Sequence, residues 1–167
     1  MKLSRALALP IALLLAFSAL PIYLGSPGDA STNSAPAAEC RGCHQAPGGE
    51  AAVRVIGLPD RYEPGKAYAV TIAVESQLQS QGETQGGFSV SASKGELEVA
   101  DPTHTQMSAG FLTHTAEGAT QRTWRFTWRA PQATGTAELT VAVLAANGDF
   151  SPNGDAAATQ AFSLEPR

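Results

Sequence analysis

Apolar and polar residues alternate along most of the chain after residue 53. Two segments with large apolar faces cover residues 67–75 and 123–130, and Pro131 ends the second. Their apolar residues on one face are Tyr68, Val70, Ile72 and Val74 in the first segment and Trp124, Phe126 and Trp128 in the second. Successive side chains of a strand point to opposite sides, so a period of two predicts β-strands with one buried face.

Shorter segments repeat this pattern between turn-forming residues. We expect strands over residues 53–57, 88–92, 97–99, 138–146 and 159–164. In residues 88–92 the apolar side chains alternate with serines, which predicts a half-buried strand. Residues 101–110 show no periodicity and are expected to form an irregular loop. Seven or eight short strands without a convincing amphipathic helix predict an all-β fold, an immunoglobulin-like Greek-key β-sandwich.

Composition agrees with one small β-rich domain. The chain has 167 residues, of which 43% are hydrophobic, so it is too apolar to be disordered. Its 16 Gly and 11 Pro suit many turns. Fifteen acidic residues against 11 Lys and Arg, with no basic cluster, argue against nucleic acid as a partner.

The N-terminus carries an export pattern. Lys2 and Arg5 precede an uncharged apolar stretch over residues 6–24. This stretch approaches the roughly 20 residues that a membrane helix needs, so a retained anchor stays open beside a cleaved signal. We therefore expect residues 1–30 to be a signal peptide or N-terminal membrane anchor. The remainder would lie in the periplasm or elsewhere outside the cytoplasm, at the inner membrane if the anchor is kept.

A flexible linker over residues 31–39 leads to the most specific motif of the chain, Cys40-Arg-Gly-Cys43-His44. C-x-x-C-H is the attachment pattern of haem c. Two thiols add to the vinyl groups of one haem, and the next residue supplies an axial imidazole to the iron. Residues 40–52 are thus expected to be a haem-attachment segment before a sandwich over residues 53–167.

Two other uses of this motif stay open. Outside the cytoplasm, Cys40 and Cys43 could form a local disulfide or a redox-active pair. A structural zinc site would need four ligands, and the sequence has no second cysteine pair.

Several segments resemble the Reeler domain, and a bacterial branch of it known as choice-of-anchor V. The matching segments cover residues 62–68, 87–92, 112–115, 124–131 and 147–155, in that order, after a C-x-x-C-H segment at residues 40–44. The resemblance implies an immunoglobulin-like sandwich, an exported location and no enzymatic activity. Animal Reeler domains carry no haem, so the resemblance does not decide whether haem is present.

If haem c is bound, its iron has a second axial position to fill. The candidates are His114, Met107 and His104. We favour His114, which we expect at the start of a strand, although a purely structural hydrogen-bonding role would explain it equally well. A methionine would raise the reduction potential relative to a second histidine. An open position is the remaining alternative.

The loop over residues 147–155 carries several side-chain oxygens on a glycine-rich backbone. Such oxygens suit Ca²⁺. Asn-Gly and Gly-Asp are also ordinary turn formers, which is the interpretation we favour. Calcium binding stays open.

The sequence thus predicts an exported monohaem c-type cytochrome that is not an enzyme. It would exchange single electrons with redox partner proteins, for instance as an accessory subunit of a membrane-bound electron-transfer complex. The alternative is a haem-free surface or adhesion module in which Cys40 and Cys43 form a disulfide. A third option is a haem sensor with an open coordination site. No phosphate-binding loop or catalytic serine motif supports an enzyme.

Overall fold

The computed structural model describes Cys40, His44 and residues 48–167. The expected signal or anchor over residues 1–30, the linker over 31–39 and Cys43 lie outside the described residues. In the described part of the chain, no helical segment has the length and hydropathy of a membrane span.

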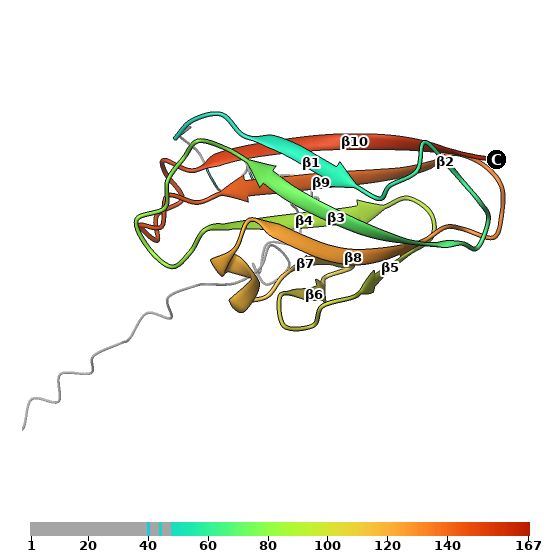
Figure 1. Ribbon diagram of the computed structural model, residues 1–167, viewed down its shortest axis with the longest axis horizontal. Helices are drawn as coiled ribbons and strands as arrows, with labels where there is room; N and C mark the ends of the chain where they lie inside the picture. Colours follow the sequence, from blue (N-terminus) through green and yellow to red (C-terminus); the bar gives the residue numbers. More distant parts are fainter. Residues whose placement is uncertain (1–39, 41–43, 45–47) are drawn as a thin grey trace, which may run out of the picture.

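Ten strands and one short 3₁₀ helix follow one another in the described chain (Figure 1). The strands are β1 (Ala52–Ile56), β2 (Arg61–Tyr62), β3 (Ala67–Glu75), β4 (Gly86–Ala92), β5 (Glu96–Val99), β6 (Thr105–Ser108), β7 (Phe111–His114), β8 (Thr123–Arg129), β9 (Ala137–Ala145) and β10 (Ala156–Pro166), with η1 (Glu117–Thr120) between β7 and β8.

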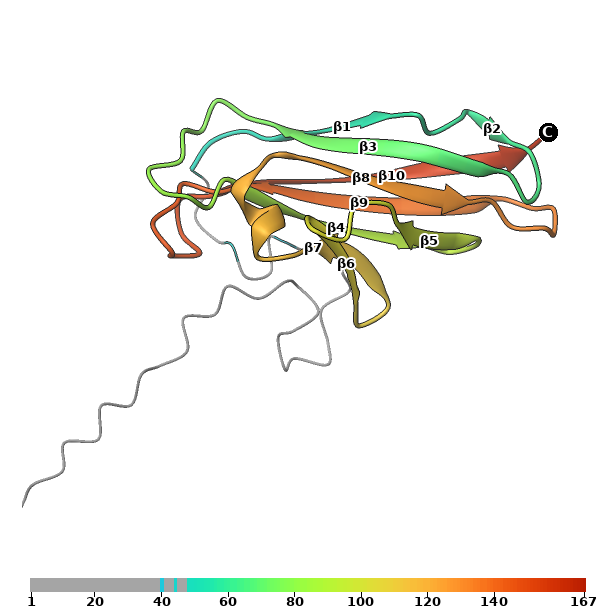
Figure 2. The same ribbon diagram turned by 60° about the horizontal axis from the view of Figure 1, so that its bottom comes forward.

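The strands form two sheets that pack face to face (Figure 2). One sheet has four strands in the order β1-β3-β8-β5, and the other has six in the order β2-β10-β9-β4-β7-β6. The short β2 runs parallel to β10, whereas the other paired neighbours are antiparallel. The structure therefore confirms the predicted all-β sandwich.

The core lies between the sheets, where the alternation placed it. The aromatic face of β8 is buried, with Trp124 1%, Phe126 1% and Trp128 0% exposed. Both indole nitrogens find backbone acceptors, because Trp124 Nε1 donates to the Gly118 oxygen at 2.8 Å and Trp128 Nε1 to the Lys94 oxygen at 3.2 Å. Burial of these rings thus leaves no indole donor unpaired.

Strand β4 differs from its prediction as a half-buried strand. Phe88 and Val90 face the core, but Ser89 on the other side is also 0% exposed. Its register neighbours Ala142 on β9 and Thr113 on β7 are likewise 0% exposed. A central strand flanked by β9 and β7 can be covered on both sides, which a single strand's alternation does not reveal.

Residues 101–110 are not wholly irregular, contrary to the sequence-based expectation. They contain β6, which pairs with β7 across a turn at Ala109 and Gly110. The φ angles of these residues are 47° and 87°, and positive φ at both central positions is what a two-residue hairpin turn requires. His114 is accordingly the last residue of β7 rather than the start of a strand.

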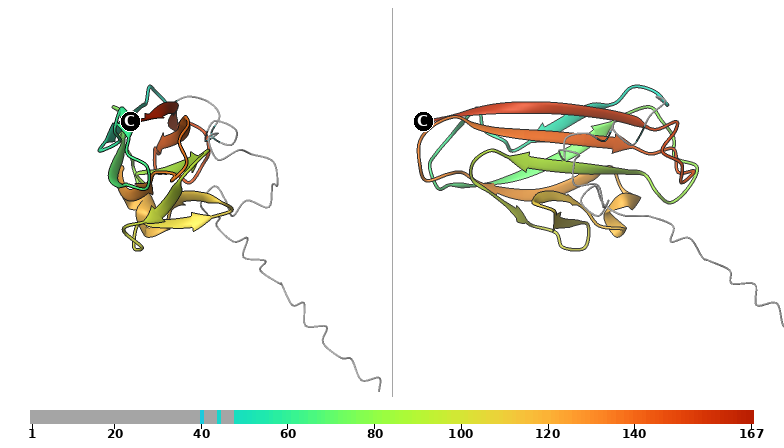
Figure 3. Two further views of the ribbon diagram at one scale, coloured as in Figure 1. Left: turned by 90° about the vertical axis from the view of Figure 1, so that its right-hand side faces the viewer. Right: turned by 180° about the vertical axis from the view of Figure 1, so that it is seen from behind.

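The two ends of the sandwich carry different segments. Figure 3 shows the chain terminus after β10 at one end and the loop between β9 and β10 at the other. The end with this loop, residues 147–155, is called the loop end below, and the end with the chain terminus is called the far end.

Candidate functional site

Asp155 joins the haem-attachment segment to the sandwich at the loop end. Its carboxylate oxygen Oδ2 lies 2.5 Å from Nδ1 of His44, and its Oδ1 accepts the backbone N–H of Asn147 at 2.9 Å. Its backbone oxygen accepts the N–H of Gly48 at 2.9 Å. The Asp155 side chain is only 3% exposed. Three hydrogen bonds therefore converge on one nearly buried residue, two from the haem-attachment segment and one from the loop itself.

The contact with Asp155 fixes how the His44 ring is used. An ionised carboxylate can only accept hydrogen bonds, so Nδ1 of His44 carries the proton and donates it. No other hydrogen bond joins the ring to a described residue, which leaves Nε2 for another partner. The His44 side chain is 31% exposed. A histidine whose Nδ1–H is held by a carboxylate is the usual arrangement of a metal ligand.

One backbone hydrogen bond joins Cys40 and His44. The N–H of His44 donates to the oxygen of Cys40 at 2.9 Å, a bond between residues four apart as in an α-helix. Cys43 lies outside the described residues.

Gly48 lies directly against the loop between β9 and β10. A Cβ atom on Gly48 would come within 1.6 Å of the Gly154 oxygen. Only glycine allows this approach of two backbones. The sequence shows a glycine at both positions, but it does not predict that Gly48 and Gly154 lie against each other.

The loop over residues 147–155 uses its polar side chains to form turns. Asn147 Oδ1 accepts the N–H of Asp149 at 3.1 Å, and Asp149 Oδ1 accepts that of Ser151 at 2.8 Å. Ser151 Oγ accepts the N–H of Asn153 at 3.2 Å. Within the described residues, no group of three or more His, Cys, Asp or Glu could hold a metal ion. These bonds support the turn-forming interpretation of the loop.

His114, at the end of β7, forms a hydrogen bond with the backbone of β4. The N–H of Phe88 lies 3.2 Å from its Nδ1, and the Phe88 oxygen accepts the Thr113 hydroxyl at 2.6 Å. A Cβ atom on Gly87 would come within 2.7 Å of the imidazole, so the ring packs closely on the β4 backbone. The Phe88 N–H can only donate, so we assign Nδ1 of the neutral ring as its acceptor and Nε2 as the protonated nitrogen.

Burial and a neighbouring charge both disfavour a charge on His114. Burial lowers the pKa of this imidazole below its ordinary value, and the nearby His44 lowers it further. A hydrogen bond from the charged ring to the Phe88 oxygen opposes both effects. His114 is therefore a neutral, hydrogen-bonded histidine close to the haem-attachment segment.

The other two candidates for the second axial position differ from His114. Nδ1 of His104 lies 2.7 Å from Oδ2 of Asp101, and this hydrogen bond lowers the pKa of Asp101. Met107 on the edge strand β6 is 47% exposed.

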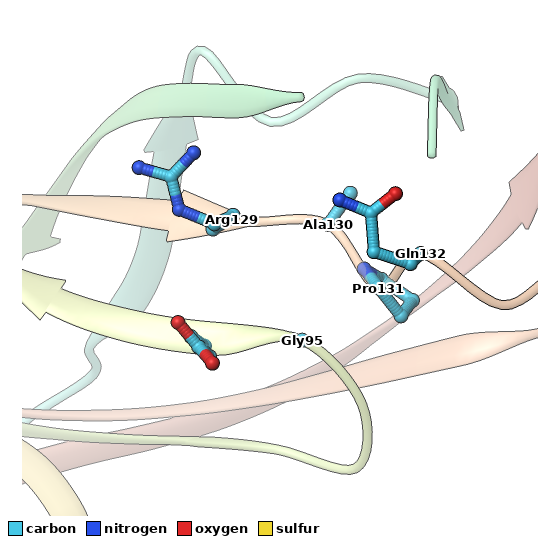
Figure 4. A pocket seen from close by; sticks show the side chains of 6 residues that line it. Gly95, Arg129, Ala130, Pro131 and Gln132 are labelled. Carbon is cyan, nitrogen blue, oxygen red and sulfur yellow. The ribbon is translucent and has the colours of Figure 1, made fainter. Parts of the chain in front are cut away.

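A surface hollow lies at the far end, away from these histidines. It is lined by Gly95, Glu96, Arg129, Ala130, Pro131 and Gln132, at the start of β5 and the end of β8 (Figure 4). The Arg129 Nε atom donates to Oε1 of Glu98 at 2.7 Å. Arg129 is the only positively charged residue in this lining, so its charge is already paired with a carboxylate. None of the described candidate haem ligands lines it.

Comparison with solved structures identifies similar folds. The human F-spondin reeler domain has a TM-score of 0.50 and 19% sequence identity, covering 74% of this chain and 93% of its own. The Reelin-N domain of F-spondin has a TM-score of 0.50 and 22% identity, covering 77% and 95% respectively. No protein-family model and no curated protein matches the sequence. The fold is Reeler-like.

Sequence reasoning found His44 and His114 but missed Asp155. Asp155 was noted only as part of a turn-rich loop, and 111 residues separate it from His44. An acidic residue next to glycine and asparagine looks like any other turn former. Its burial, which distinguishes it from Asp149 in the same loop, is a property of the folded chain.

Proposed function

We propose that this protein is an exported monohaem c-type cytochrome that carries electrons outside the cytoplasm. Cys40 and Cys43 would hold one covalent haem c, and His44 would bind its iron. The observation that carries the proposal is the hydrogen bond between His44 Nδ1 and Asp155, which leaves Nε2 as the available nitrogen.

The residues present fit a haem ligand set. His44 is partly exposed, and its backbone N–H donates to the oxygen of Cys40. Zinc has less support, because the described residues contain no cluster of the three or four ligands that it requires. A bound haem would supply a one-electron iron couple. The chain would hold it beside the loop end, orient its axial histidine and shield one side from water.

His114 is our candidate for the second axial position. Its Nε2 could bind only if the proton moved to Nδ1, which would then donate to the Phe88 oxygen at 3.3 Å. The Phe88 N–H would lose its acceptor in that state. Binding of the iron by His114 would therefore break its hydrogen bond with the Phe88 N–H. The alternative is that the second axial position of the iron stays open.

The proposal places the protein in the periplasm or another extracytoplasmic compartment. Its partners would be redox proteins, including a membrane-bound electron-transfer complex. An electron carrier of this kind catalyses no reaction of its own. The likeness to F-spondin domains concerns the fold alone. It supports a stable β-sandwich module that could carry the haem-attachment segment.

An optical spectrum of the exported protein tests the proposal. Cells able to mature c-type cytochromes should yield a protein with the reduced pyridine haemochrome spectrum of haem c. A matched variant with Cys40→Ser and Cys43→Ser should lack it. A colourless wild-type protein would reject the cytochrome and leave the disulfide-containing module.

Carbon monoxide then separates the two coordination states. Added to the reduced protein, it should change the spectrum strongly if the second position is open and weakly if His114 occupies it. In the second case, His114→Ala should restore the strong response, whereas Met107→Ala should not.

A further inference from the structure

Asp155 has more contacts than a turn residue needs. Three other polar residues of its loop, Asn147, Asp149 and Ser151, each accept one backbone N–H two residues ahead. Asp155 instead accepts from Asn147 behind it and from His44 across the molecule. One carboxylate oxygen serves the loop, and the other serves the histidine.

The two carboxylate oxygens of Asp155 together fix the orientation of its contact with His44. Oδ1 is held by the Asn147 N–H at 2.9 Å, so rotation of the carboxylate would break that bond. The Asp155 backbone oxygen also holds Gly48, four residues after His44. The histidine is therefore restrained through its ring and through its chain by one residue, and Nε2 has a defined direction.

We propose that Asp155 is the positioning residue of His44 and that its negative charge lowers the reduction potential of the bound haem. This inference rests on the proposed function. A carboxylate that accepts the Nδ1–H of a ligating imidazole makes the ring a stronger electron donor, which favours the oxidised iron. The same charge near the iron favours the oxidised form electrostatically.

Asp155→Asn is the variant that tests this role. It keeps the shape but has one acceptor oxygen for two donors, Asn147 N–H and His44 Nδ1–H. We expect its reduction to become about tenfold more favourable, a rise of about 59 mV for a one-electron couple. Asp155→Glu keeps the charge and should stay nearer the wild type in potential.

Asp149→Asn is the matched control. Asp149 lies in the same loop and loses the same charge, but its Oδ1 accepts only from Ser151. The remaining amide oxygen can still accept that bond, so its potential should change much less. Equal shifts in the two variants would show a general charge effect and overturn the positioning role.

A second measurement on the wild type covers the case in which Asp155→Asn does not fold. Histidine-labelled NMR of the reduced protein should show a slowly exchanging, downfield Nδ1–H proton on His44, as expected for a proton held by a carboxylate. A proton that exchanges quickly would overturn the inference. So would an unchanged potential in a folded Asp155→Asn variant.

The two proposals fail in different ways. A wild-type protein without haem overturns both the cytochrome and the role of Asp155 in it. A wild-type protein with haem, combined with no difference between Asp155→Asn and Asp149→Asn, overturns only the role of Asp155.

Discussion

The two ends of the sandwich are stabilised by different interactions. At the far end, Trp128 packs edge-on against Tyr62 with ring centroids 5.6 Å apart and stacks on Tyr68 at 5.8 Å. At the loop end, Phe88 packs on Trp124 with ring centroids 4.9 Å apart, and the bond between His44 and Asp155 joins the haem-attachment segment to the sandwich. Both ends therefore have a buried aromatic contact, and the loop end adds a contact that depends on charge and on the position of a proton.

The ion pairs show the same contrast. The far-end pair between Lys66 and Glu63 is about half exposed on both sides, at 49% and 45%. In the pair at the loop end, the Asp155 side chain is 3% exposed. Exposed pairs contribute little to stability, because water and salt screen them. The comparison indicates that the pair at the loop end is less screened by solvent than the pair at the far end.

The largest expected effect is at the far end. Trp128→Ala should lower the free energy of unfolding by about 3–5 kcal/mol, because it empties a fully buried ring site. Denaturant unfolding measures this loss. In the folded fraction, the haem spectrum should stay that of the wild type. An altered spectrum would contradict the separation of the two ends.

A smaller effect is expected at the loop end. Asp155→Ala leaves the N–H of Asn147 and the Nδ1–H of His44 without their acceptor, and should cost about 1–3 kcal/mol of unfolding free energy. Hydrogen exchange at Asn147 should accelerate locally. Asp149→Ala, at an exposed position, should change the global stability less. Equal losses would mean that the burial of Asp155 has no energetic consequence.

The third prediction concerns the pH dependence of stability. Burial lowers the pKa of His114 in the folded state, so protons bind more tightly to the unfolded chain. The contribution of His114 is fully present above the ordinary histidine pKa and is lost as the pH falls through the lowered folded value. The variant with Cys40→Ser and Cys43→Ser serves as the parent. Its free energy of unfolding is measured against pH with and without His114→Asn, and the difference gives the contribution of His114.

Two outcomes of that titration are informative. The His114→Asn background should show a weaker loss of stability in acid than its parent. If the two curves run parallel, His114 titrates normally and is not the neutral, hydrogen-bonded histidine described above.

The smallest effect is expected from the exposed charges. Glu63→Gln removes the carboxylate that contacts Lys66 and Arg167 at the far end. The change in unfolding free energy should be at the limit of detection in low salt and absent in high salt. A large loss that persists in high salt would show that this surface pair matters for the fold.

The sequence predicts best those features that depend on residues close together in the chain. The bounds of β3 and the buried face of β8 follow from alternation along single strands. Strand β6 was missed because four mostly polar residues carry little hydrophobic signal, although the turn at Ala109 and Gly110 completes its hairpin.

The site could be predicted only in part for the same reason. The motif at Cys40 and His44 is local and was found. The partnership of His44 with Asp155, and the contact of His114 with Phe88, join segments far apart in the chain. Such contacts depend on the register of the sheets and on loop geometry, which a single sequence does not encode in any short pattern.

The central claim is that a haem is bound covalently through Cys40 and Cys43. The intact mass of the exported protein, measured after denaturation, tests this most directly. We predict a wild-type mass greater than that of the polypeptide by one haem, and no such increase when both cysteines are replaced by serine. A wild-type mass equal to the bare polypeptide less two hydrogens would contradict the account and show a disulfide instead.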